Sequence, residues 1–145
     1  QLSHRYAEKD DLPEVYVMYL QALKELGEEF YDKKALDFLL LCWSKAPCVL
    51  LLKGAEIIGF AGLNTFTPAY NNKVYLKEYM FFIKPEFRGL KAWRALCKAV
   101  QNVSNEFEIP FLGEHRIQGD IKHHLRLIKM AGAKPMAIKS LYEAK

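Results

Sequence analysis

The stretch "FFIKPEFRGLKAW", Phe81–Trp93, joins a run of aromatic and branched residues to a pattern with helical spacing. Pro85 has no backbone N–H and cannot continue a sheet ladder, so we expect the strand to end just before it. The chain then has only a few residues in which to turn and begin a helix that contains Trp93. The stretch therefore predicts a strand, a tight turn and a helix N-terminus.

A helix N-terminus after such a turn is suited to an anion. Its first N–H groups have no acceptor within the helix, and the helix dipole places partial positive charge behind them. Gly89 lets a ligand approach the backbone closely, and Arg88 and Lys91 are expected to add mobile positive charge. An ordinary strand end followed by a helix would show the same features, so the turn alone leaves both interpretations open.

The flanking sequence predicts an α/β (α+β) chain. Asp11 is expected to cap the first helix, with Glu14 three residues later as its capping-box partner. The motif "GFAG", Gly59–Gly62, lies within a strand and indicates a bulge or close packing. The predicted elements, in the order βααβββαβαβ, are a strand within 3–11, helices over 13–26 and 32–46, strands over 48–53, 56–66 and 74–84, the helix around Trp93, a short buried strand at 109–113, a basic helix over 120–132 and a last strand over 134–144.

Composition indicates one globular domain, residues 1–145. Half of the residues are hydrophobic (51%) and 26% are charged, as in a packed globule. There is no internal repeat or low-complexity linker, and three cysteines without a CxxC pair favour buried, reduced thiols. No apolar run approaches a membrane span, and the first residues are too polar for a signal peptide, so we expect a cytoplasmic protein, in the host cytoplasm if the chain is viral.

Charge is unevenly distributed along the chain. Residues 1–114 carry 14 basic and 15 acidic side chains, whereas residues 115–145 carry 7 basic and 2 acidic ones. The C-terminal excess suits an anionic ligand, although a solvated helix face has the same composition. Nucleic-acid binding is disfavoured because no RNA-recognition, helix-turn-helix or zinc-finger signature accompanies it.

The segment "FFIKPEFRGLKAW" resembles motif A of the GNAT-type N-acetyltransferase superfamily, in which V-x-P-x-x-R-G leads into an R/Q-x-x-G-x-G/A loop that holds the acetyl-CoA pyrophosphate. The resemblance extends to the opening "RYAEKDDLPEVYVMY", the hairpin "LLKGAEIIGFAGL" and the ending "LIKMAGAKP". It implies a mixed, mostly antiparallel central sheet with splayed central strands and flanking helices. Divergent "RGxxA" loops also resemble bacteriophage members.

The resemblance also implies where acetyl-CoA would bind. The pantetheine arm would pair with the backbone of Phe81, Phe82 and Ile83, and one N–H there would stabilise the oxyanion. The pyrophosphate would lie on the turn formed by Arg88, Gly89, Leu90, Lys91, Ala92 and Trp93. Lys91 and Trp93 replace the small residues of the family loop; the Trp93 ring would crowd the cofactor, pack into the core or cover the adenine.

For catalysis the resemblance implies direct attack by an amine, which must first lose a proton. Glu78, flanked by apolar residues, is the first candidate for the base because burial would raise its pKa, and His115 is the second. Each is equally well an ordinary surface side chain. Ile128 stands where the family has its tyrosine acid; Tyr31, Tyr70 or Tyr142 would have to substitute for it, or the thiolate leaves unassisted.

Two functions follow as alternatives. The chain is an acetyl-CoA-dependent N-acetyltransferase acting on an amine-bearing small molecule, protein or peptide, or it is a degenerate GNAT fold that senses CoA or serves as an interaction module. Phe30, Tyr31 and Tyr70 would frame an acceptor pocket or cap the core. No HExxH motif or ligand spacing points to a metal. The sequence leaves homo-oligomerisation open.

Overall fold

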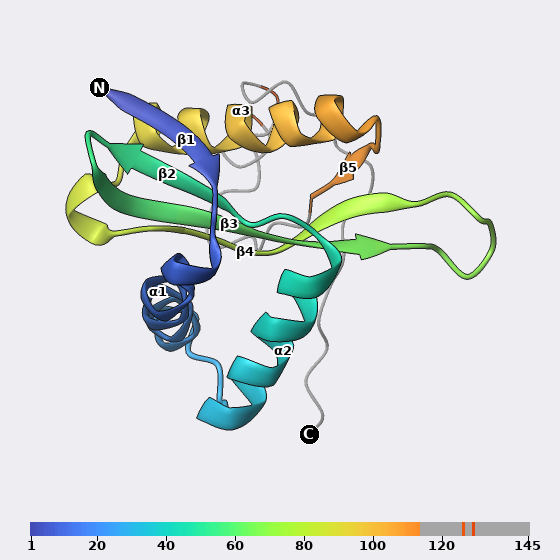
Figure 1. Cartoon of the computed structure of the whole chain (residues 1–145), viewed down its shortest axis with the longest axis horizontal. Helices are drawn as coiled ribbons and strands as arrows, with labels where there is room; N and C mark the ends of the chain where they lie inside the picture. Colours follow the sequence, from blue (N-terminus) through green and yellow to red (C-terminus); the bar gives the residue numbers. More distant parts are fainter. Residues whose placement is uncertain (114–125, 127–128, 130–145) are drawn as a thin grey trace. The chain divides into compact units, whose positions relative to one another are not determined.

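The computed structural model describes residues 1–113 together with Arg126 and Lys129. Residues 1–114 form one compact unit and residues 115–145 a second, of which only those two exposed helical residues are described. In the first unit five strands form one sheet in the order β1-β2-β3-β4-β5, as Figure 1 shows. The elements are β1 (Leu2–Tyr6), α1 (Leu12–Glu25), α2 (Asp32–Lys45), β2 (Val49–Lys53), β3 (Glu56–Phe66), β4 (Tyr75–Ile83), α3 (Leu90–Phe107) and β5 (Phe111–Leu112), with short 3-10 turns η1 (Lys9–Asp11) and η2 (Pro85–Phe87).

The observed order confirms the predicted βααβββαβ series as far as β5; the predicted basic helix and last strand lie outside the described residues. Neighbouring strands from β1 to β4 are antiparallel, and β5 is parallel to β4. One prediction here is wrong: β5 is half-buried rather than buried, and it is a strand of only two residues beside β4. The chain therefore has the mixed, mostly antiparallel sheet expected of the GNAT fold.

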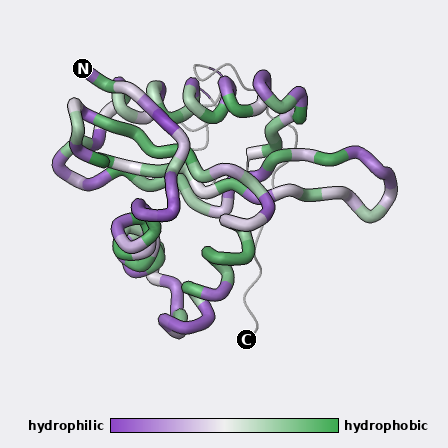
Figure 2. The backbone as a smooth tube through the Cα atoms, viewed as in Figure 1, coloured by the Kyte–Doolittle hydropathy of each residue, from purple (hydrophilic) through white to green (hydrophobic). Residues whose placement is uncertain are grey.

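Helices cover both faces of the sheet, so the core has two parts. On one face α3 packs Leu96, Val100 and Val103 against strand residues such as Leu51. On the other face α1 and α2 pack against the opposite side chains of the same strands. Figure 2 shows the hydrophobic residues gathered along the strands between these layers. Within the described part of the chain, no helix combines the length and apolar character needed to cross a membrane.

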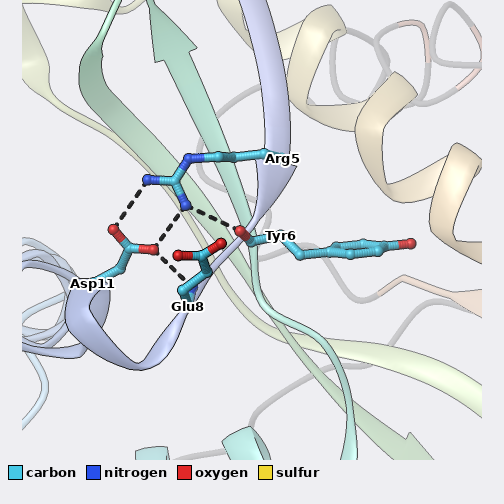
Figure 3. A network of polar contacts seen from close by, with 4 residues as sticks. All are labelled: Arg5, Tyr6, Glu8 and Asp11. Carbon is cyan, nitrogen blue, oxygen red and sulfur yellow. Dashed lines mark hydrogen bonds and ion pairs between the residues drawn. The ribbon is translucent and has the colours of Figure 1, made fainter.

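The entry to α1 differs from the predicted capping box. Asp11 is itself helical, with φ −81° and ψ −13°, and its side chain makes no cap hydrogen bond to α1. Its carboxylate instead accepts the Glu8 N–H at 2.7 Å and both terminal nitrogens of Arg5, at 2.8 and 3.0 Å (Figure 3). The cap therefore belongs to η1, one turn before the predicted position, because the chain already turns at Lys9.

The glycines of "GFAG" mark close packing, as predicted. A Cβ at Gly59 would lie 2.5 Å from the Phe82 carbonyl oxygen, and one at Gly62 would lie 2.3 Å from the Tyr79 ring. The register also shifts beside each glycine, between Leu51 and Leu52 and between Gly62 and Leu63. Both predicted causes, bulge and close approach, are therefore present.

Candidate active site

The outer edge of β4 is the first part of the candidate site. The Lys84 N–H donates to the Ile58 carbonyl of β3 at 2.8 Å, and backbone groups alternate in direction along an antiparallel strand. Phe82 therefore directs its N–H and C=O toward β3, whereas Phe81 and Ile83 direct theirs to the opposite edge. The hydrogen bond of the Ile83 carbonyl is consistent with this alternation, because the carbonyl accepts from Arg88 Nε at 2.7 Å rather than from β3.

This edge opens shortly after β4 begins. Within the described residues β5 pairs with β4 only at Leu76 and Lys77. Beyond Lys77 the edge that carries the Phe81 and Ile83 backbone groups has no described strand partner. A linear ligand with amide groups could bind there as an added strand does.

A bulge lies at the point where the edge opens. Met80 pairs with Gly62 and Glu78 with Leu63, so Tyr79 is the extra residue of β4. The Tyr79 ring lies edge-on to Tyr19, with ring centres 5.7 Å apart, on the face covered by α1 and α2. Burial raises the pKa of the Tyr79 hydroxyl, so it stays protonated at neutral pH. Tyr79 was not among the site residues predicted from the sequence, where the nearby glycine is the only signal that points to it.

Glu78 lies immediately before the bulge. It is half-buried, and its Oε2 atom is inaccessible to solvent. Its carboxylate lies near Cys97 of α3: burial, with a further contribution from the negative charge of Glu78, raises the pKa of Cys97 to about 11. One oxygen of this carboxylate is thus withdrawn from bulk water beside the opening of β4.

The turn after β4 ends in an open helix N-terminus. The first backbone bond of α3 runs from the Trp93 N–H to the Gly89 carbonyl at 3.0 Å, so the helix itself provides no acceptor for the N–H groups of Leu90, Lys91 and Ala92. Gly89 is extended, with φ 163° and ψ 174°, and a Cβ there would meet nothing within 4 Å. The space beside Gly89, immediately before these N–H groups in the chain, is therefore open.

The side chains of α3 divide between solvent and core. Lys91 is exposed beside the open N–H groups, while Ala92 is buried. Trp93 is partly buried and packs against the α3-side core, which selects one of the three placements left open by the sequence. The large residue at this position of the loop therefore stabilises the helix start by packing.

Arg88 is not the mobile charge that the sequence suggested. Besides the Ile83 carbonyl, its guanidinium donates to Glu25 Oε2 at 2.6 Å and lies over the Phe82 ring, 5.4 Å from its centre. An arginine held by three groups has little freedom to follow a ligand. Its partner Glu25, at the end of α1, was missed because nothing in the sequence connects residues 63 positions apart.

A pocket of 380 Å³ adjoins this turn. It is lined by residues of the turn and by the ends of β1 and β2, including Lys53, Arg88, Lys91 and the carboxylate-bearing Glu86. The pocket lies on the β1–β2 side of the helix start and not along the outer edge of β4. The basic side chains give the pocket a positive character, which adds to the attraction of the open N–H groups for an anion.

The remaining predicted residues are separate from this site or undescribed. His115, Tyr142, Ile128 and Ala133 lie outside the described residues. Tyr31 and Tyr70 are strongly exposed, so neither caps the core. Figure 1 shows the connection 67–74 projecting away from the loop after α1. Within residues 1–113, no cluster of three or more histidine, cysteine or acidic side chains is placed to hold a metal.

Comparison with known proteins identifies the fold. No protein-family model and no curated protein matches the chain in sequence. Among solved structures it is similar to AAC(6')-Iy in complex with a bisubstrate analogue, CoA-S-monomethyl-acetylneamine (TM-score 0.75, 13% identity, covering 100% of this chain and 99% of that one). A predicted acetyltransferase with acetyl-CoA from Clostridium acetobutylicum gives TM-score 0.72 at 17% identity, covering 99% and 96%. A GNAT family acetyltransferase from Staphylococcus aureus gives 0.63 at 15%, covering 99% and 98%. The chain has the fold of the GNAT-type acetyltransferases.

Proposed function

We propose that the chain is an N-acetyltransferase that transfers an acetyl group from acetyl-CoA to an amine. The observation that carries the proposal is the continuity between the outward-facing backbone of β4 and the open N-terminus of α3. A pantetheine arm carries amides that can pair with the strand edge, and a pyrophosphate suits a helix N-terminus. Solved structures of the same fold hold a CoA-derived ligand or acetyl-CoA.

The alternating direction of the backbone groups along β4 determines which residues would contact the cofactor. The C=O of Phe81 and the N–H of Ile83 are the groups that would hold pantetheine, whereas Phe82 contributes packing through its ring. The N–H groups of Leu90, Lys91 and Ala92, with the Lys91 ammonium, would hold the pyrophosphate. Arg88 would support the site through its hydrogen bonds to the Ile83 carbonyl and Glu25 rather than by binding the cofactor.

The proposed reaction is direct transfer. The Phe81 N–H would stabilise the oxyanion that forms as the amine nitrogen bonds to the thioester carbon, a role worth about 3 kcal/mol for one donor. Glu78 would accept the proton that the amine loses, and His115 is the alternative base. The C–S bond then breaks and releases a thiolate, whose conjugate thiol has a pKa of about 8.5 and needs no obligatory acid.

Calorimetric titration of acetyl-CoA tests the proposal. Gly89→Ala adds a methyl group into open space in a backbone conformation that any residue adopts, so the free protein should keep its stability. Where the methyl group blocks a phosphate, binding should weaken by about tenfold, a loss of about 1.4 kcal/mol. Lys91→Ala should also weaken binding, whereas Lys98→Ala, an exposed lysine about two turns further along α3, should not.

The outcomes separate the two functions. Wild-type binding followed by turnover with an amine supports the acetyltransferase. Binding without turnover for any acceptor favours the CoA-sensing or interaction module. Absence of wild-type binding at millimolar acetyl-CoA would overturn both the acetyltransferase and CoA sensing, and would leave the interaction module.

A further inference from the structure

Arg88 joins three parts of the fold next to the proposed cofactor site. Its Nε donates to the Ile83 carbonyl at 2.7 Å and its Nη2 to Glu25 Oε2 at 2.6 Å, while its guanidinium carbon lies 5.4 Å from the centre of the Phe82 ring. A planar guanidinium whose nitrogens donate in two fixed directions is restricted in both position and tilt. Arg88 therefore links the end of α1 to the end of β4.

One of the contacted groups, and the residues that follow Arg88, belong to the proposed site. The Ile83 carbonyl lies on the outer edge of β4, where a pantetheine arm would pair. Gly89 and the open N–H groups of α3 follow Arg88 directly in the chain. A change in the Arg88 side chain therefore displaces the edge and the turn together.

Glu25 is the anchor of this arrangement. It is the last residue of α1, and it contacts none of the backbone groups proposed to hold CoA. The side chains of Arg88 and Glu25 are 44% and 37% exposed, so solvent screens their attraction and the pair contributes little to overall stability. Its effect should accordingly be local to the turn.

We propose that Glu25 is a positioning residue that holds the β4–α3 turn through Arg88 and thereby sets the affinity for acetyl-CoA. The affinity part rests on the proposed function. In the competing mechanism, Arg88 itself binds a phosphate of the cofactor, and the Glu25 carboxylate competes with that phosphate for the guanidinium. The two mechanisms predict opposite changes in acetyl-CoA affinity when the Glu25 charge is removed. In the competing mechanism, binding strengthens because Arg88 is freed and a negative charge is lost. In the positioning mechanism, binding weakens because the turn loses its support.

The first test compares acetyl-CoA titrations of the wild type, Glu25→Gln and Glu29→Gln. Glu29 is exposed and lies four residues after Glu25, so its substitution removes the same charge without weakening the charge-assisted hydrogen bond to Arg88. Glu25→Gln should weaken binding by about fivefold or more, as for energetic coupling between sites, while Glu29→Gln leaves it unchanged. Equal or tighter binding in Glu25→Gln overturns the proposal, as does equal weakening in both variants.

The second test needs no cofactor. Amide hydrogen exchange over residues 84–92 of the free protein should be faster in Glu25→Gln than in the wild type and in Glu29→Gln, because local opening of the turn becomes easier. Unchanged exchange overturns the positioning role. If the wild type fails to bind acetyl-CoA, the proposed function and the affinity part are overturned, and the exchange comparison still decides whether Glu25 holds the turn.

Discussion

At the scale of single residues, Glu78 is the clearest test of the proposed chemistry. Glu78→Gln keeps the shape of the side chain but removes its ability to accept a proton, so turnover should fall by about 10²- to 10⁴-fold, the usual contribution of a general base. Acetyl-CoA affinity should stay unchanged, because the proposed cofactor contacts come from the β4 edge and the turn. Steady-state kinetics with an accepted amine, together with calorimetry, measure both quantities.

The control for Glu78 is Glu56→Gln, an exposed carboxylate at the start of β3. It should retain full turnover. Undiminished turnover in Glu78→Gln would transfer the role of the base to another residue, with His115 as the remaining candidate.

Individual side chains also show what the sequence could predict. Gly89 was predicted to let a ligand approach the backbone closely, and the structure shows open space around it. The prediction was possible because a glycine next to a helix start is a local signal. The fixed position of Arg88 was not predictable, since it depends on Glu25, which is 63 residues away in sequence and adjacent only in the folded chain. Trp93 had three local alternatives, and packing of the whole helix was needed to choose among them.

At the scale of elements, the bulge in β4 depends on a glycine in the neighbouring strand. The Tyr79 ring occupies the space that a Cβ at Gly62 would take, with a ring carbon at 2.3 Å. Gly62→Ala should therefore lower the free energy of unfolding by about 1–3 kcal/mol, as overpacking does. Urea denaturation of the wild type and the variant measures the difference.

A double variant identifies the cause of that loss. Tyr79→Ala removes the ring, so adding Gly62→Ala to it should cost much less than in the wild type. Gly59→Ala is the matched control: its Cβ would meet the Phe82 carbonyl oxygen, a backbone atom, so Tyr79→Ala should not relieve it. Equal costs of Gly62→Ala in both backgrounds would contradict the assigned contact.

The entry to α1 gives a pH-dependent prediction. The hydrogen bonds from Arg5, with that from the Glu8 N–H, lower the pKa of Asp11 below its usual 3.8 (Figure 3). Because the pKa of Asp11 is lower in the folded than in the unfolded protein, its ionised form stabilises the fold at any pH above the unfolded-state pKa. This contribution disappears as the pH falls through the folded-state pKa. Asp11→Ala should cost about 1 kcal/mol at pH 7, as loss of a cap does, and progressively less on acidification. Thermal unfolding at several pH values, with the exposed Asp10→Ala as control, measures this difference; a cost that does not change with pH would contradict it.

The order of elements was predictable because apolar spacing is a local property of each segment. Helices over 13–26 and 32–46 were predicted and occur as α1 and α2 with bounds that differ by at most one residue. The cap at Asp11 was misplaced because a 3-10 turn precedes the helix and uses the same carboxylate. Short-range signals thus located the elements, while the contacts at their ends depended on neighbouring turns.

At the scale of the whole molecule, the sheet carries two cores on opposite faces. Leu96 on α3 and Leu39 on α2 are both fully buried, each in a different core. Truncation of either to alanine should cost about 2–5 kcal/mol. Because no side chain of residues 1–113 belongs to both cores, the costs should add in the double variant.

The prediction that residues 1–145 form one domain can be tested through the positions of the two tryptophans. Trp43 lies on α2 and Trp93 on α3, so fluorescence reports on both layers of the first unit, residues 1–114, whereas circular dichroism reports on the whole chain. One cooperative domain requires both signals to change together during urea unfolding. Separate midpoints would instead show that residues 115–145 unfold independently. In that case the CoA titrations should be repeated at urea concentrations between the midpoints, since retained binding there would assign the cofactor site to the first unit alone.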